Sequence, residues 1–173
     1  MIMKTKKYLL AGALILSLST PAIAQNDGYK AALNPIISAI EAAPNDAKAG
    51  KDLIKEYLKV YKKDEEAITA LGNVYLAQRN FTEAMKVANS IVTNKKMNGT
   101  LGYLLLGDIV ALQDSVGNAG AAAQHYATAI SLDPHNVAAY ERYAKVYRHV
   151  NPEVAVQKLE ELRKVEPNYP VEA

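Results

Sequence analysis

Histidines are the residues of this chain whose type most readily supports chemistry near neutral pH. There are three of them, His125, His135 and His149, spaced 10 and 14 residues apart. Two histidines that share a metal ion on one helix are four residues apart, because that spacing puts both rings on one face. We therefore predict surface or loop histidines that bind no metal.

Acidic pairs and a glycine-rich segment are the other candidates for chemistry. Glu65-Glu66 and Glu160-Glu161 are adjacent, so their side chains diverge around a helix and are predicted to be solvated. The segment 117–120 lacks the Lys-Ser/Thr and the preceding strand of a phosphate loop, and is predicted to be a lengthened helix–helix turn. There is no cysteine to act as a nucleophile or a metal ligand. These residues predict no enzyme and no cofactor.

The first residues resemble a targeting signal. Lys4, Lys6 and Lys7 precede the apolar run 8–18, and Ala22-Ile23-Ala24 has the small-x-small order of a cleavage site. The alternative, a membrane anchor, requires about 20 apolar residues, and this run is shorter and ends near a proline. The pattern predicts a signal peptide over 1–24, cleavage near Ala24, and a periplasmic or secreted protein of the bacterial cell envelope without a membrane span.

Removing that segment changes the charge of the chain. The whole chain has 20 Lys and Arg against 18 acids, and the segment contains three lysines and no acid. The net charge falls from +2 to −1, since 17 basic residues then face 18 acids. Net charge therefore gives no reason to predict a nucleic-acid or membrane-surface partner.

A motif recurs along the rest of the chain, at intervals of 35 and 37 residues. Its three copies are Leu71-Gly72-x-x-Tyr75, Leu106-Gly107-x-x-Val110 and Tyr143-Ala144-x-x-Tyr147. Each copy is followed by an amphipathic segment with a small residue near its start, and the last two segments end in Asp133-Pro134 and Glu166-Pro167. This pattern resembles the tetratricopeptide repeat.

The resemblance implies an all-α fold, an α-solenoid of antiparallel helix pairs wound as a right-handed superhelix. It implies repeats at about 64–97, 98–135 and 136–168, with helices at 65–78, 81–93 and 152–165. Asn80 and Asn136 are predicted N-caps. Gly72 is predicted to face Ala84 where two helices approach closely, so that alanine is tolerated at position 72 and leucine is not.

Residues 31–63 are predicted to be a fourth, degenerate repeat. Asn34 would cap its first helix, with Pro35 at the first helical position. Gly50 would be the small residue of its second helix, and Gln25–Tyr29 a flexible start. Three loops depart from the family pattern: 93–96 has no proline, 113–120 is longer, and 148–152 is shorter.

In this family the first helices of the repeats line a concave groove that binds peptides or protein segments. The resemblance therefore implies a protein or peptide partner. Helical phase places the following residues in the groove: Thr69, Asn73, Leu76, Ala77, Leu104, Leu105, Asp108, Leu112, Ala138, Glu141, Arg142, Lys145 and Arg148. We expect the leucines to anchor an apolar side chain and the cations to meet an acidic group. The alternative is that the stack buries Leu104 and Leu105 and that the cations are only solvated.

Two further interpretations remain open. The chain may be read as a spacer within a longer repeat array, without a groove ligand. An enzyme or a sugar-binding accessory would need a cluster of groove aromatics, for which Tyr140, Tyr143 and Tyr147 come nearest, although their phase matches the core. The family's carboxylate clamp is not predicted, because Thr69, Leu105 and Ala138 stand at three of its positions.

Overall fold

The computed structural model describes residues 25–43, 46, 48–113 and 119–170. The predicted signal peptide and positions 114–118 of the long loop lie outside this part. Within it the chain is all-helical and contains no strand. Its helices are α1 Gln25–Ala42, α2 Lys51–Val60, α3 Glu65–Ala77, α4 Phe81–Val92, α5 Thr100–Gln113, α6 Ala119–Leu132, α7 Val137–Tyr147 and α8 Pro152–Val165.

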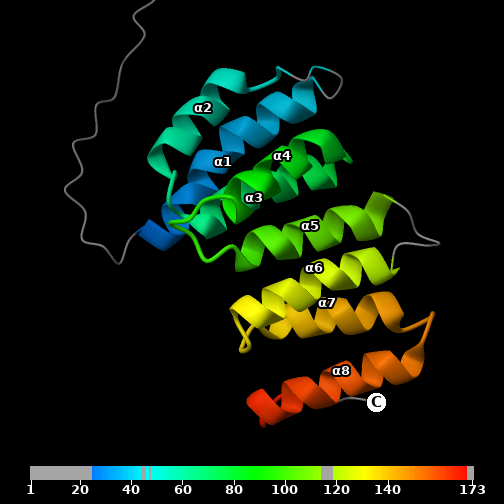
Figure 1. Ribbon diagram of the computed structural model, residues 1–173. Helices are drawn as coiled ribbons and strands as arrows, with labels where there is room; N and C mark the ends of the chain where they lie inside the picture. The colour runs from blue at the N-terminus through cyan, green and yellow to red at the C-terminus, as the bar shows by residue number, and fades with distance from the viewer. Residues whose placement is uncertain (1–24, 44–45, 47, 114–118, 171–173) are drawn as a thin grey trace, which may run out of the picture.

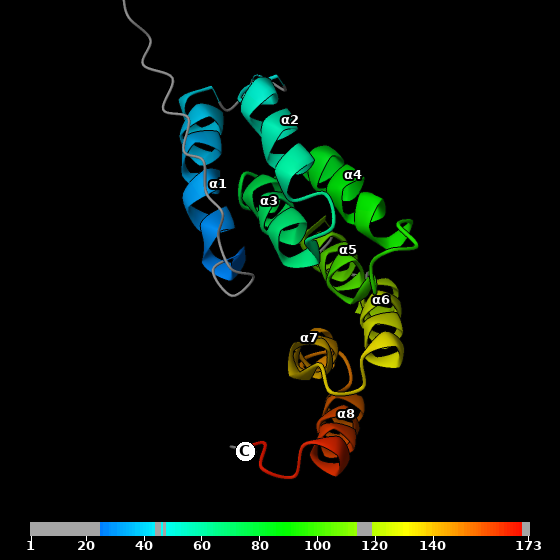
Figure 2. The ribbon, with the colours of Figure 1, turned by 90° about the vertical axis from the view of Figure 1, so that its left-hand side faces the viewer.

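Consecutive helices pack against each other as antiparallel pairs that follow one another along the molecule (Figure 1). Seen from the side, α1, α3, α5 and α7 form one row and α2, α4, α6 and α8 form a second row (Figure 2). We call these the inner and the outer row. The arrangement is compatible with a helical repeat solenoid, as predicted.

Side-chain caps begin several of the helices where the sequence predicts a helix start. The carboxylate or amide oxygens of Asp64, Asn80, Asn136 and Asn151 accept hydrogen bonds from the backbone N–H three residues on, at 3.0, 3.2, 3.1 and 3.4 Å. Such a bond satisfies an N–H that has no partner within the helix. The predicted caps Asn80 and Asn136 are confirmed, and α8 has the predicted bounds.

The first helix differs from the prediction. α1 runs without interruption through Pro35, so Asn34 is not its cap, and the predicted flexible start is helical. A proline inside a helix costs about 3 kcal/mol. Leu33, Ile36 and Ile40 lie on both sides of the proline and are at most 7% exposed. Burying these side chains offsets the cost and holds the helix continuous.

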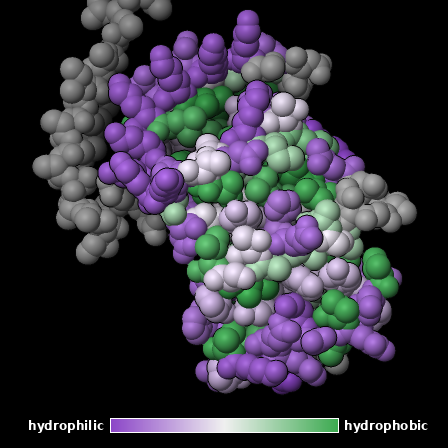
Figure 3. Space-filling model, in the orientation of Figure 1, coloured by the Kyte–Doolittle hydropathy of each residue, from purple (hydrophilic) through white to green (hydrophobic). Residues whose placement is uncertain are grey.

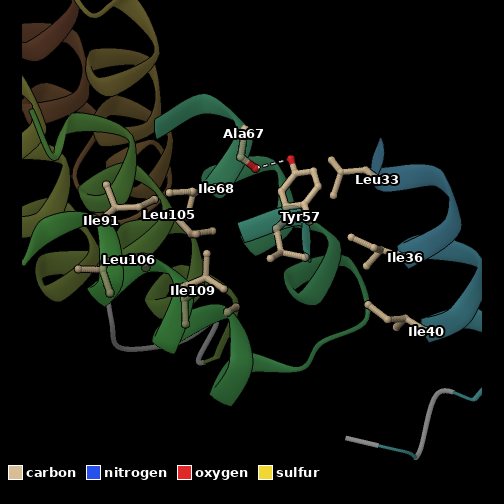
Figure 4. Packing of buried hydrophobic residues seen from close by; sticks show 14 residues of the cluster. Leu33, Ile36, Ile40, Tyr57, Ala67, Ile68, Ile91, Leu105, Leu106 and Ile109 are labelled. Atoms are coloured by element: carbon tan, nitrogen blue, oxygen red, sulfur yellow. Dashed lines mark hydrogen bonds between the residues drawn. The ribbon is translucent and has the colours of Figure 1, made fainter. Parts of the chain in front are cut away.

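The second helix, α2, departs from the pattern of the later helix pairs. Gly50 precedes α2 with φ +68°, so it is not inside the helix as predicted, although its Cα does approach α1 near Ala39. The buried residue of α2 is Tyr57, whose hydroxyl donates to the Ala67 carbonyl at 2.8 Å (Figure 4). Tyr57 and the apolar side chains of α1 therefore both join this pair to α3.

Gly72 and Gly107 lie where neighbouring helices approach closely. A Cβ on Gly72 would lie 2.3 Å from Leu105 Cδ2 and 3.2 Å from Val87 Cγ1. The prediction that Gly72 faces Ala84 is wrong, because α5 of the next pair makes the closest contact. A Cβ on Gly107 would lie 2.3 Å from Tyr126 Cε1. Glycine at these positions leaves room for side chains of a neighbouring helix.

Glu65 connects two repeats. Its carboxylate accepts hydrogen bonds from the Gly99 N–H at 3.1 Å and the Leu101 N–H at 2.8 Å, at the start of α5. The prediction that this carboxylate is solvated is wrong for Glu65. The loop before α5 lacks the usual acidic-Pro step, and the cap supplied from α3 orders that connection instead.

Candidate functional site

The inner row carries the side chains predicted to face a ligand, and the structure places them in three environments. Leu104 is buried. Thr69, Leu76, Asp108 and Arg142, together with Ala138, are half-buried. The exposed residues are Asn73, Ala77, Leu112, Glu141, Lys145 and Arg148.

The predicted apolar middle of the groove is largely core. Leu104 is 3% exposed and Leu105 is 1% exposed. Leu104 packs with Ala122 and Tyr126 of α6, while Leu105 packs with the cluster formed by α1 to α5. The prediction that these two leucines anchor a ligand is wrong, because the stack buries both of them, as the alternative for the leucines states. Leu112 remains 48% exposed.

Asp108 is the centre of a polar cluster that joins α5, α6 and α7. Its Oδ1 accepts a hydrogen bond from the Tyr126 hydroxyl at 2.9 Å and lies 3.3 Å from Arg142 Nε. The side chains of Asp108 and Arg142 are 23% and 38% exposed. Two predicted groove residues are therefore brought together, and each neutralises the other.

The electrostatics of this cluster follow from its burial. Desolvation raises the pKa of Asp108, while the charge of Arg142 and the hydrogen bond from Tyr126 act in the opposite direction. Burial, and then the neighbouring Asp108, raise the pKa of Tyr126. Tyr126 is not among the residues predicted from the sequence. The signal that points to it is Gly107, since a glycine at a helix contact makes room for a large partner.

Thr69 contributes a polar group of a different kind. Its hydroxyl oxygen is buried and has no hydrogen-bond partner among the described residues. Asn73 lies one turn further along the same face of α3 and is exposed. An unpaired buried hydroxyl costs about 1–3 kcal/mol.

The C-terminal end of the inner row is basic and exposed. Lys145 and Arg148 are exposed and form no salt bridge within the described part of the chain, although the charge of Lys145 acts on Asp108 and lowers its pKa. Glu141 is also exposed, but its Oε1 accepts a hydrogen bond from the Tyr169 hydroxyl at 2.8 Å. Two of the four charged side chains predicted on α7 therefore remain available to a ligand.

The tyrosines of α7 do not form an open aromatic platform. Tyr140 is 4% exposed, and its hydroxyl donates to the Pro134 carbonyl at 3.2 Å. The Tyr143 ring is covered by the Lys158 ammonium, 4.7 Å from its centroid, and lies 5.3 Å from the Tyr147 ring. These contacts place the aromatic side chains in the packing between α7 and its neighbouring elements.

The histidines occupy unrelated positions. His125 is half-buried against Tyr103, with ring centroids 6.3 Å apart, and burial lowers its pKa. His135 Nδ1 lies 2.7 Å from Glu166 Oε1, and His149 is exposed. Within the described residues, no group of three or more His, Asp or Glu side chains is arranged to hold a metal ion.

No known protein-family model matches this chain, and no curated protein matches it with significance. The resemblance to the tetratricopeptide repeat therefore stays a prediction from the repeated motif, with which the all-helical structure is compatible. In the part of the chain that the structure describes, no helix is both long and apolar enough to cross a membrane.

Proposed function

We propose that this chain is a non-enzymatic protein-interaction module of the tetratricopeptide type, which binds a peptide or a protein segment along its inner row. It acts in the bacterial cell envelope after the segment 1–24 has been removed. The partner lies across α3, α5 and α7.

One observation carries this proposal: the inner row retains exposed side chains that the packing does not use. Asn73, Leu112, Lys145 and Arg148 are exposed, whereas the residues that hold the same helices together are buried. These four belong to three successive helices of one row (Figure 2). A partner that contacts all of them follows the row from α3 to α7.

The chemistry of the row suggests the chemistry of the partner. Lys145 and Arg148 favour a carboxylate at one end of the bound segment. Leu112 offers a contact for one apolar side chain, and Asn73 can donate to and accept from a peptide backbone. The bound segment is therefore acidic at the end that lies over α7.

Site-specific photo-crosslinking in envelope extract tests this proposal. A crosslinker at Asn73 or at Leu112 should capture the same protein, whereas one at Thr82, exposed on α4 of the outer row, should not. Adducts that form equally from Thr82 would refute the proposal, and so would no adduct from either inner position.

Paired charge reversals test the basic end. Lys145→Glu with Arg148→Glu should abolish the Asn73 adduct, because both cations are exposed and their loss leaves the packing intact. Arg163→Glu with Lys164→Glu on α8 makes the same charge change at exposed positions and should leave the adduct unchanged. We avoid Arg142, because its replacement would also remove the ion pair with Asp108.

A further inference from the structure

Asn98 and Gly99 form the only Asn-Gly pair in the sequence, and they lie in the turn that leads into α5. Asn98 is exposed. Gly99 has φ +88°, a conformation that glycine adopts without steric cost. Figure 3 shows mainly hydrophilic residues at the edge of the molecule where Figure 1 places this turn. Water can therefore reach the Asn98 side chain.

An asparagine that precedes a glycine is chemically reactive. The backbone nitrogen of the following residue can attack the asparagine side-chain carbon Cγ, because the covalent chain keeps these two atoms close enough to close a small ring. Glycine hinders this attack least, since it has no Cβ beside the attacking nitrogen. The sequence alone therefore marks Asn98 as the most reactive amide of this chain.

Two hydrogen bonds hold the reacting groups of this pair. The Gly99 N–H donates to Glu65 Oε2 at 3.1 Å, and the Thr100 hydroxyl donates to Asn98 Oδ1 at 3.1 Å. The first bond ties the attacking nitrogen to α3, and the charge of the carboxylate opposes the loss of the nitrogen's proton. The second bond polarises the carbonyl that is attacked. The nitrogen is thus the restrained member of a reactive pair.

We propose that Asn98 is a site of spontaneous deamidation and that the hydrogen bond from Gly99 to Glu65 limits its rate. The Gly99 nitrogen attacks Asn98 Cγ, the bond between Cγ and Nδ2 breaks, and Nδ2 leaves as ammonia together with the proton that the Gly99 nitrogen gives up. One water molecule then opens the succinimide ring at either carbonyl, which leaves aspartate or isoaspartate at position 98. This inference is independent of the proposed peptide ligand.

The modification changes the junction between two helix pairs. Glu65 caps the N–H groups of Gly99 and Leu101, so a carboxylate at position 98 places a like charge beside this cap. In the isoaspartate product the backbone runs through the side chain and is longer, which shifts Gly99 away from Glu65. Both products loosen the start of α5 from α3.

Mass spectrometry tests the inference on the purified full chain, stored in alkaline buffer and then digested in acid, where the reaction is slow. We expect modification at Asn98 in the wild type and none at Asn89, which is also exposed but lies inside α4. Glu65→Ala should react about tenfold faster. That factor corresponds to about 1.4 kcal/mol, close to the contribution of one hydrogen bond to a charged group.

Matched variants separate the hydrogen bond from charge in general. Glu66→Ala removes an exposed carboxylate from the same turn of α3 and should change the rate by less than about twofold, because the Gly99 N–H bonds to Glu65. Glu65→Gln keeps an acceptor oxygen without the charge, and its rate should fall between those of the wild type and Glu65→Ala. Hydrogen exchange at Leu101 should quicken as the wild-type protein ages but not in Asn98→Ser, which has no amide to lose.

Three outcomes would overturn the inference. The first is an unmodified Asn98 in the folded wild type under conditions that modify the urea-unfolded chain. The second is an equal rate in Glu65→Ala and Glu66→Ala. The third is a slower reaction in Glu65→Ala and Glu65→Gln, which would make Glu65 a base that assists the attack. Circular dichroism of every variant checks that the fold is retained.

Discussion

Replacing Gly107 with alanine tests the close contact between α5 and α6. The new Cβ would lie 2.3 Å from Tyr126 Cε1 and 2.7 Å from both Cδ1 and Cζ. Carbon atoms in contact are about 3.5–4.0 Å apart, so the ring has to move by more than about 1 Å. Tyr126 is 2% exposed, and its ring is rigid. Such a movement also strains its hydrogen bond to Asp108.

Three contributions set the change in the free energy of unfolding: two lower it and one raises it. Overpacking costs about 1–3 kcal/mol, and weakening the hydrogen bond costs up to about 1 kcal/mol. Alanine recovers about 1 kcal/mol because it is the better helix former. We therefore expect Gly107→Ala to lower the free energy of unfolding by up to about 3 kcal/mol, and to lower Tm by roughly 2–4 °C for each of these kcal/mol.

Urea and thermal unfolding followed by circular dichroism measure this loss. The matched control is Gly120→Ala in α6, where a Cβ would meet only the Tyr147 hydroxyl, at 3.9 Å, among the residues that the structure describes. This control should be neutral or slightly stabilising. If Gly107→Ala were as stable as Gly120→Ala, Gly107 would not be the point at which α5 and α6 approach, and the packing argument would fail.

Three other predictions concern neighbouring contacts. Gly72→Ala should destabilise the fold less than Gly107→Ala, because the new Cβ would meet a terminal methyl of Leu105 that can rotate away. Urea and thermal unfolding measure this loss as well. Glu65→Ala should lower the free energy of unfolding by about 1–3 kcal/mol, since two N–H groups of the next repeat lose their cap; hydrogen exchange at the start of α5 should quicken. Arg142→Gln should raise the pKa of Asp108 still further, because Arg142 opposes the effect of burial, and an NMR titration of the carboxyl carbon would detect it. Because burial raises the folded-state pKa of Asp108, the stability from this carboxyl is fully present below the unfolded pKa and is lost as pH rises through the folded value.

Local signals predicted most of the helices. The caps Asn80 and Asn136 and the bounds of α8 are correct because they depend on residues only a few positions away. The continuity of α1 was not predicted, because it depends on packing against residues that are distant in the sequence. Pro35 by itself predicts a helix start. The helix continues through Pro35 because the side chains on both sides of it are buried. Packing energy outweighs local preference there.

The candidate site was predicted in part. Helical phase correctly predicted that Asn73, Lys145 and Arg148 lie at the surface. It failed for Leu104, because phase describes one helix, whereas burial depends on the neighbouring helix that covers it. A position on the inner row is therefore open to a ligand only where no neighbouring helix reaches it.

The sequence by itself determined an all-helical chain of repeated pairs, with the positions of most turns, because periodicity, caps and small residues act over short distances. Only the tertiary structure decided which side chains meet. Asp108, Tyr126 and Arg142 come from three helices, and no spacing along the chain predicts their contact. The same holds for Gly72, whose unusual place in a helix indicated a close approach but did not reveal that α5 of the next repeat makes it.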